Sequence, residues 1–327
     1  MGQLSNAYTL FLSLLVEAFP FLLIGVLLSN ALRVFVDERQ LLNRLPKHPL
    51  LAALCGSLGG FLFPACECGN VPVARRLLLK GCSNAVAIGF LLAAPVVNPI
   101  VLWSTWVAFR DQPELVWLRL GSTLLIATVI GWLFSRQPDL RPFLQKPVAA
   151  ALDLRQQGTP SLLQGGSFLA GEGALGAIAL DRQLEAETDI PRDLRWASFL
   201  DGSLQELREM GSVLVLGSLG AALIQTAVPR EWLLSLGQNA FSSVLVMIVL
   251  ALIVSICSTV DAFFALAFAG SFTTGSLLAF LVLGPMVDLK GIGMLLTVFR
   301  SRAVAYLVLL PTLMTMAIAL LVNYHFS

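Results

Sequence analysis

The chain has 327 residues, of which 57% are hydrophobic and 13% are charged. Soluble globular domains carry about 25% charged residues, so this composition excludes an ordinary soluble domain and predicts a polytopic all-α membrane protein. The formal net charge of +1 indicates no partner, and we do not expect nucleic acid because the sequence has no basic patch large enough to bind it. The partners that we expect are the lipid bilayer and a small-molecule or ion substrate.

Apolar segments alternate with short polar stretches along the whole chain. They cover residues 8–36, 50–63, 69–79, 83–109, 115–135, 201–228, 241–257, 260–270, 272–299 and 303–323. Between them, residues 136–197 hold most of the mid-chain charge together with Pro, Gly and Gln. This composition predicts a first transmembrane repeat over 1–135, a polar cytoplasmic connector over 136–197 and a second transmembrane repeat over 198–327.

The two membrane halves resemble each other at a nearly constant offset. Matching residues are Cys66 and Cys257, Asn70 and Asp261, and Asn98 and Asp288, with separations of 191, 191 and 190 residues. A diverged internal duplication produces matches of this kind.

Two arrangements in the membrane fit the short apolar segments, because a spanning helix needs about 20 apolar residues. Each short pair, such as 50–63 with 69–79, either forms a re-entrant helical hairpin or joins into one broken span, which gives eight crossings. Lys and Arg gather more strongly on one side in the hairpin arrangement, which leaves Arg110, Arg119 and Arg230 opposite. We therefore expect two inverted repeats, each with three crossings plus a hairpin, with eight crossings as the alternative.

Turn-forming residues interrupt the apolar segments at matching places in the two halves. Pro95 to Pro99 interrupts one long segment, and Gly284 to Gly291 interrupts its counterpart. Together with the two cysteine-bearing hairpin tips, these breaks are typical of a transporter site at the bilayer midplane. The substrate-binding candidates at the breaks and tips are Cys66, Glu67, Cys68, Asn70, Asn98, Cys257, Asp261 and Asp288.

The thiols among these candidates suit soft substrates such as metalloids, thiophilic metal ions and sulfur-containing solutes. Cys66, Cys68 and Cys257 are candidate soft ligands, but their spacing does not make a four-ligand metal site. The other reading of a buried cysteine is a small apolar filler, which we expect for Cys55 and Cys82.

The charged and amide residues have alternative structural roles. Asp288 can pair with Lys290, and Asn98 and Asp261 can cap the ends of half-helices. Glu17 lies inside the first apolar segment and is the candidate for binding a coupling ion, because intramembrane carboxylates are functional candidates by default.

Several basic residues follow the first tip, where they can set the orientation of the chain in the membrane. One acidic residue of the second half lies among other charged residues. We expect Arg75, Arg76 and Lys80 to be cytoplasmic orientation signals. Glu209 borders other charged residues, so we expect it at the membrane interface.

The motif from Pro64 to Arg75, PACECGNVPVAR, and the later motif from Ala93 to Pro99, AAPVVNP, resemble the bacterial predicted-permease family that includes the ArsP-type organoarsenical efflux permeases. The resemblance covers roughly 8–135 and 198–323 and leaves out the connector. It implies a multi-pass inner-membrane permease and, for the characterised branch, export of trivalent organoarsenicals through cysteine thiols.

These observations favour a secondary permease that exports a small thiophilic or anionic solute. The alternative is a membrane-embedded metal-sensing or redox-sensing protein that binds without transport. We do not expect an enzyme, since the cysteines lack a paired histidine base, and we expect no cofactor. A homo-oligomer is compatible with the sequence.

Overall fold

The computed structural model describes residues 2–35, 45–46, 48–62, 67–137, 141–145, 148–149, 192–227, 240–258, 260–270 and 272–326. Apart from one isolated β-bridge between Leu144 and Phe299, the regular structure of these residues is helical. The expected connector lies mostly outside them, as do residues 63–66 at the first tip.

The first half of the chain forms helices that follow the apolar segments. They are α1 (Gly2–Phe35), α3 (Pro49–Gly59), α4 (Glu67–Leu79), α5 (Asn84–Ala93), α6 (Pro99–Ala108) and α7 (Glu114–Ser135), with short 3-10 helices at Gly60–Leu62 and Arg141–Phe143. Polar caps begin several of them: the Ser83 hydroxyl, for example, accepts a hydrogen bond from the Val86 amide at the start of α5.

The second half forms a corresponding series of helices. They are α10 (Arg192–Ala227), α12 (Ala240–Val254), α13 (Asp261–Leu266), α14 (Thr274–Met286), α15 (Leu289–Val298) and α16 (Ser301–Phe326). The expected interruptions are confirmed in both halves, because α5 ends at Ala93 before α6 starts at Pro99, and α14 ends at Met286 before α15.

Four stretches of the described chain are long and apolar enough to cross a membrane. They are Ala7–Ala31, Glu114–Ser135, Thr274–Val298 and Ser301–His325. Large apolar side chains such as Val16, Trp117 and Leu309 are exposed on their surfaces, as expected where lipid replaces water. The prediction of an all-α multi-pass membrane protein is therefore confirmed.

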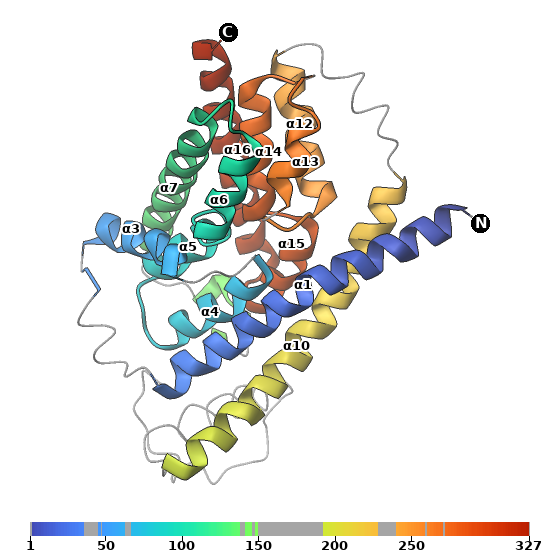
Figure 1. Ribbon diagram of the computed structural model, residues 1–327. Coiled ribbons are helices and arrows are strands. Elements are labelled where there is room, and N and C mark those ends of the chain that lie inside the picture. The colour runs from blue at the N-terminus through green and yellow to red at the C-terminus, as the bar shows by residue number, and fades with distance from the viewer. Residues whose placement is uncertain are drawn as a thin grey trace.

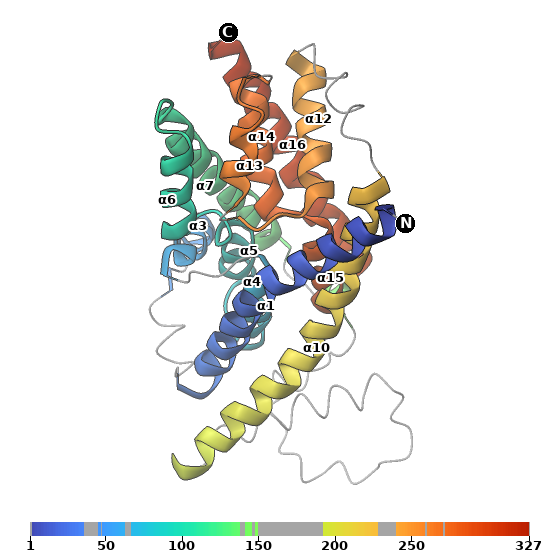
Figure 2. The same ribbon diagram turned by 45° about the vertical axis from the view of Figure 1, so that its right-hand side comes forward.

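Two three-helix groups and a pair of long tilted helices build the molecule (Figure 1). Helices α3, α5 and α7 pack on one another, and so do α12, α14 and α16. Helix α7 also contacts α14 and α16, which joins the two groups. The long helices α1 and α10 lie side by side across the lower part of both views (Figures 1 and 2).

Contacts between the halves involve the short helices. Helix α6 of the first half packs against α13 of the second, and α4 of the first half packs against α15 of the second. Helix α4 also packs against α1 at a glycine pair, since a Cβ on Gly25 would lie 2.3 Å from the Gly69 Cα. The short helices α4 and α13, which follow the two cysteine-bearing tips, therefore each contact a helix of the other half.

Candidate functional site

The first break, between α5 and α6, is closed by a buried amide. Asn98 precedes Pro99, and its Oδ1 accepts a hydrogen bond from the Ile100 backbone N–H at 3.0 Å. The expected alternative role of Asn98 as a helix cap is thus confirmed. The cap satisfies an amide that a break inside the membrane leaves without a helical partner.

The second break, between α14 and α15, uses a carboxylate in the same way. Asp288 Oδ1 accepts a hydrogen bond from the Gly291 N–H at 2.6 Å, and Asp288 Oδ2 lies 3.9 Å from the Lys290 Nζ. Both side chains are almost completely buried. The expected pairing of Asp288 with Lys290 is confirmed, and the same carboxylate caps α15.

The tip that follows α12 touches the second break. Ser255 has a φ of 44°, which is uncommon for a residue other than glycine, and its hydroxyl accepts a hydrogen bond from the Leu289 N–H at 3.2 Å. Cys257 is buried, and its carbonyl accepts hydrogen bonds from the backbone N–H groups of Val260 and Asp261.

The tip that follows α3 also contacts the break of its own half. A Cβ on Gly60 would lie 2.4 Å from the Ala94 Cα, so the two backbones are in direct contact. Cys66 lies outside the described residues, and for Glu67 only the helical backbone is described. The predicted substrate-binding roles of Cys66 and Glu67 therefore stay predictions.

Two candidates at the start of α4 are completely buried. Neither Cys68 nor Asn70 is exposed, and no hydrogen-bond partner reaches the Oδ1 or Nδ2 atom of Asn70 in the described part of the chain. Buried amides normally have partners, so such a group calls for a specific explanation. An amide that stays available in the interior is suited to bind a solute.

A buried ion pair joins the second tip to the first half. Arg119 of α7 donates from Nη2 to Asp261 Oδ2 at 2.6 Å and from Nη1 to Oδ1 at 3.2 Å, and Nη1 also donates to the Thr105 hydroxyl of α6 at 2.7 Å. The exposed fractions of the two charged side chains are 0% and 3%. The bidentate geometry is the strong form of such a pair.

Arg119 is the residue whose role sequence reasoning missed. It was grouped with the basic residues that flank the segments, but it lies inside α7 and is completely buried. A single arginine inside the apolar segment 115–135 is the signal that could have indicated this role. Asp261, in turn, does not act as the cap residue of α13, which is Val260; its carboxylate is held by Arg119.

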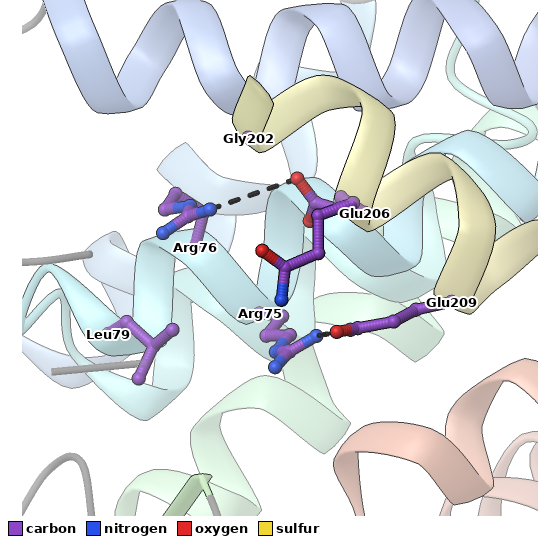
Figure 3. A pocket seen from close by; sticks show the side chains of 7 residues that line it. Arg75, Arg76, Leu79, Gly202, Glu206 and Glu209 are labelled. Atoms are coloured by element: carbon purple, nitrogen blue, oxygen red, sulfur yellow. Dashed lines mark hydrogen bonds and ion pairs between the residues drawn. The ribbon is translucent and has the colours of Figure 1, made fainter. Parts of the chain in front are cut away.

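A second group of charges lies where α1, α4 and α10 meet (Figure 3). Glu206 of α10 lies 3.8 Å from Arg76 and accepts hydrogen bonds from the side chains of Ser29 and Asn30. Arg75 lies 3.4 Å from Glu209. The pocket between them is lined by Arg75, Arg76, Leu79, Gly202, Gln205, Glu206 and Glu209. The two arginines, expected as orientation signals, therefore also pair with acidic residues of the second half.

Two further predictions stay untested by this geometry. Glu17 lies on α1, but its side chain is outside the described part of the structure. No group of three or more His, Cys, Asp or Glu side chains that could hold a metal ion occurs among the described residues, and the thiol set that includes Cys66 falls partly outside them.

The sequence matches the profile of the predicted permease family ArsP_1 over residues 3–324. The chain belongs to this predicted permease family. The permease is also 40% identical to the UPF0718 protein YcgR of Bacillus subtilis over 315 residues, which are 96% of each chain. It is 31% identical to a putative two-component membrane permease complex subunit of Streptococcus mutans, over 96% of this chain and 94% of that protein.

No solved structure matches the permease. The family match confirms the expected resemblance, and together with the apolar helices it makes this permease a multi-pass protein of the bacterial plasma membrane. A permease family indicates a transporter rather than an enzyme.

Proposed function

We propose that this permease is a secondary transporter that moves a small thiophilic or anionic solute past two helical hairpin tips at the bilayer midplane. In this proposal the solute contacts the thiols of Cys66, Cys68 and Cys257 and the polar groups at the breaks. The direction that we propose is export.

The observation that carries the proposal is that each tip meets the break of its own half. Gly60 contacts Ala94 in the first half, and the Ser255 hydroxyl bonds the Leu289 amide in the second. Irregular backbone at membrane depth persists where protein or a wet cavity satisfies it. Paired interruptions of this kind form the substrate sites of secondary transporters. The Asn70 amide, which has no hydrogen-bond partner among the described residues, supplies a polar group there.

The packing of the helices supports an inverted repeat. Contacts of α3 with α5 and of α5 with α7 have counterparts in α12 with α14 and α14 with α16, and the contact of α6 with α13 has its counterpart in α15 with α4. The short helix that follows each tip, α4 or α13, thus packs against the other half of the chain. We propose two inverted repeats joined by a cytoplasmic connector.

Helix lengths fit the arms of re-entrant hairpins. Helix α3 has 11 residues and is therefore about 16 Å long at 1.5 Å per residue, and α13 has six residues. The hydrocarbon core of a bilayer is about 30 Å thick. Neither helix reaches across, which is what a re-entrant arm requires.

A partner protein is a further part of the proposal. The Streptococcus relative is named as a subunit of a two-component membrane permease complex. We propose that this permease also functions in a complex, with a second membrane subunit or a second copy of itself.

Flux measurements test the role of the thiols. Everted vesicles containing the full-length permease should accumulate a trivalent phenylarsenical, and the Cys66→Ser and Cys68→Ser variants should lose at least about 90% of this flux, because the soft ligands would be gone. Cys55→Ser is the matched control, since Cys55 is exposed on α3, and it should transport normally.

The same experiment separates transport from sensing. Full flux in the Cys66→Ser and Cys68→Ser variants would contradict the thiol role. Tight binding of the arsenical without any flux in the unmodified permease would contradict transport and favour the membrane-embedded sensor instead.

A further inference from the structure

The buried pair of Arg119 and Asp261 contains more hydrogen-bonding capacity than it uses. The guanidinium Nε of Arg119 has no hydrogen-bond partner in the described part of the structure, although the side chain is completely buried. An arginine offers five N–H donors in a planar fork that fits small oxyanions and carboxylates. A buried guanidinium with an unused donor is suited to bind an anion.

The surroundings leave Arg119 and Asp261 dependent on each other. Helices α6 and α14 pack against α13, and neither contains a charged residue. Ala262 and Ala265 of α13 pack in an apolar cluster with Met247 and Phe280. An anion that arrives at Arg119 therefore competes directly with the Asp261 carboxylate.

The pair also fixes the second hairpin in place. Asp261 begins α13, four residues after Cys257, while Arg119 belongs to α7 and its Thr105 partner belongs to α6. Three elements from both halves thus meet at one guanidinium. The adjoining tip contains Ser255 in a left-handed conformation, which is the kind of local strain found at moving parts of functional sites.

We propose that Arg119 is an anion-binding residue of the transport site and that Asp261 occupies the place of the transported anion in the closed state. A small anionic solute displaces the Asp261 carboxylate, which releases the α12–α13 hairpin from α7 and opens the site at Cys257. This inference rests on the proposed transport function and specifies its substrate class as a small anion.

The experiment uses the full-length permease in nanodiscs with all its cysteines in place, and mass spectrometry of the Cys257 peptide follows alkylation of that thiol alone. The alkylation rate of the buried Cys257 thiol reports release of the hairpin. The probes are chloride, nitrate, bicarbonate, sulfite, thiosulfate and phosphate, with the bulky gluconate as the control anion. At least one small probe should raise the rate about tenfold, as expected when a minor open state becomes populated.

Three variants assign the effect to the pair. Asp261→Asn removes the carboxylate that holds the hairpin, so Cys257 in this variant should be alkylated rapidly without anion. Because the competing charge is gone, the active anion should raise the melting temperature of this variant at about tenfold lower concentration than in the unmodified permease. In Arg119→Gln, the Cys257 thiol should be alkylated rapidly without anion, and no probe anion should change this rate. The doubly neutral Arg119→Gln, Asp261→Asn variant contains no unpaired buried charge, and it should fold without responding to anions.

The outcomes decide the inference separately from the proposed function. A Cys257 rate that no small anion changes, or an equal response in Arg119→Gln, overturns the anion site. If Asp261→Asn does not fold even with anion, the doubly neutral variant decides. An anion response that persists in the doubly neutral variant overturns the anion site at Arg119, and loss of the response in that variant supports it. Flux that depends on Cys68 but not on Arg119 overturns this inference and leaves the transport function standing.

Discussion

The cysteines of this chain have distinct surroundings, and the difference has chemical consequences. Cys82 lies buried in the turn between α4 and α5, and desolvation raises the pKa of its thiol to about 11, against a smaller opposing effect of Lys80. Cys55 is exposed on α3, so the expectation that it is a buried apolar filler is wrong. Because the thiolate is the reactive form, burial makes Cys82 a slow nucleophile.

We predict that Cys82 resists alkylation in the folded permease. At pH 7.5 its thiolate fraction should be roughly one in a few thousand, so N-ethylmaleimide should react slowly, and the rate should rise about tenfold per pH unit toward pH 10. Denaturation in detergent should restore rapid reaction, since the unfolded thiol has an ordinary pKa. Mass spectrometry of the Cys82 peptide measures both rates; equal rates in the two states would contradict the prediction.

At this scale, residue type and neighbouring prolines predicted the polar residues at the breaks. Asn98 was recognisable as a cap candidate because it is a polar residue beside a proline inside an apolar segment. Asp288 was expected to pair with Lys290, and its role as the cap of α15 was not predicted. The pairing of Arg119 with Asp261 was not predictable, because 142 residues separate the two partners and neither position carries information about the other.

Close backbone contact between helices is the main feature at the scale of elements. Gly25 brings α1 against α4 at Gly69, and Gly60 brings the first tip against Ala94. Small residues allow membrane helices to approach in this way. The sequence predicted each helix, but not these contacts, because a glycine inside an apolar segment does not identify the backbone that it meets.

We predict opposite effects for one substitution at two glycines. Gly25→Ala places a methyl group 2.3 Å from the Gly69 Cα, so it should destabilise the permease by about 1–3 kcal/mol through overpacking. Gly121→Ala meets no atom within 4 Å, so it should stabilise α7 by a few tenths to about 1 kcal/mol through helix propensity. Thermal unfolding in a mild detergent measures both; a stable Gly25→Ala variant would show that α1 and α4 do not pack this closely.

At the scale of the whole molecule, the side of the membrane on which the segment ends lie distinguishes re-entrant hairpins from full crossings. His48 and Ser83 are exposed near the ends of the proposed first hairpin, and Ala267 is exposed after α13. A hairpin returns to the side from which it starts, whereas a crossing does not.

We therefore predict that cysteines at positions 48 and 83 react with a membrane-impermeant maleimide from the same side. His48→Cys and Ser83→Cys should be labelled in everted vesicles, and Ala267→Cys should be labelled in right-side-out vesicles. Labelling of positions 48 and 83 from opposite sides would instead establish eight crossings. Each variant needs a check that it retains flux.

The overall plan was predictable because it depends on patterns that cover many residues. Apolar segment lengths, the breaks and the offset between halves indicated the helices in order. The ion pairs of Arg75 and Arg76 with α10 were not predictable, since the same basic residues also fit a simple orienting role.

The reciprocal contacts between the halves have a consequence for how such a molecule can exist. Helix α4 of the first half is held by Glu206 and Glu209 of α10, while α13 of the second half is held by Arg119 of α7. A polypeptide containing one half alone would leave these charges unpaired and these packing faces uncovered. Such a half-length protein would be stable only beside a second half, so separate genes for the two halves would encode an obligate heterodimer.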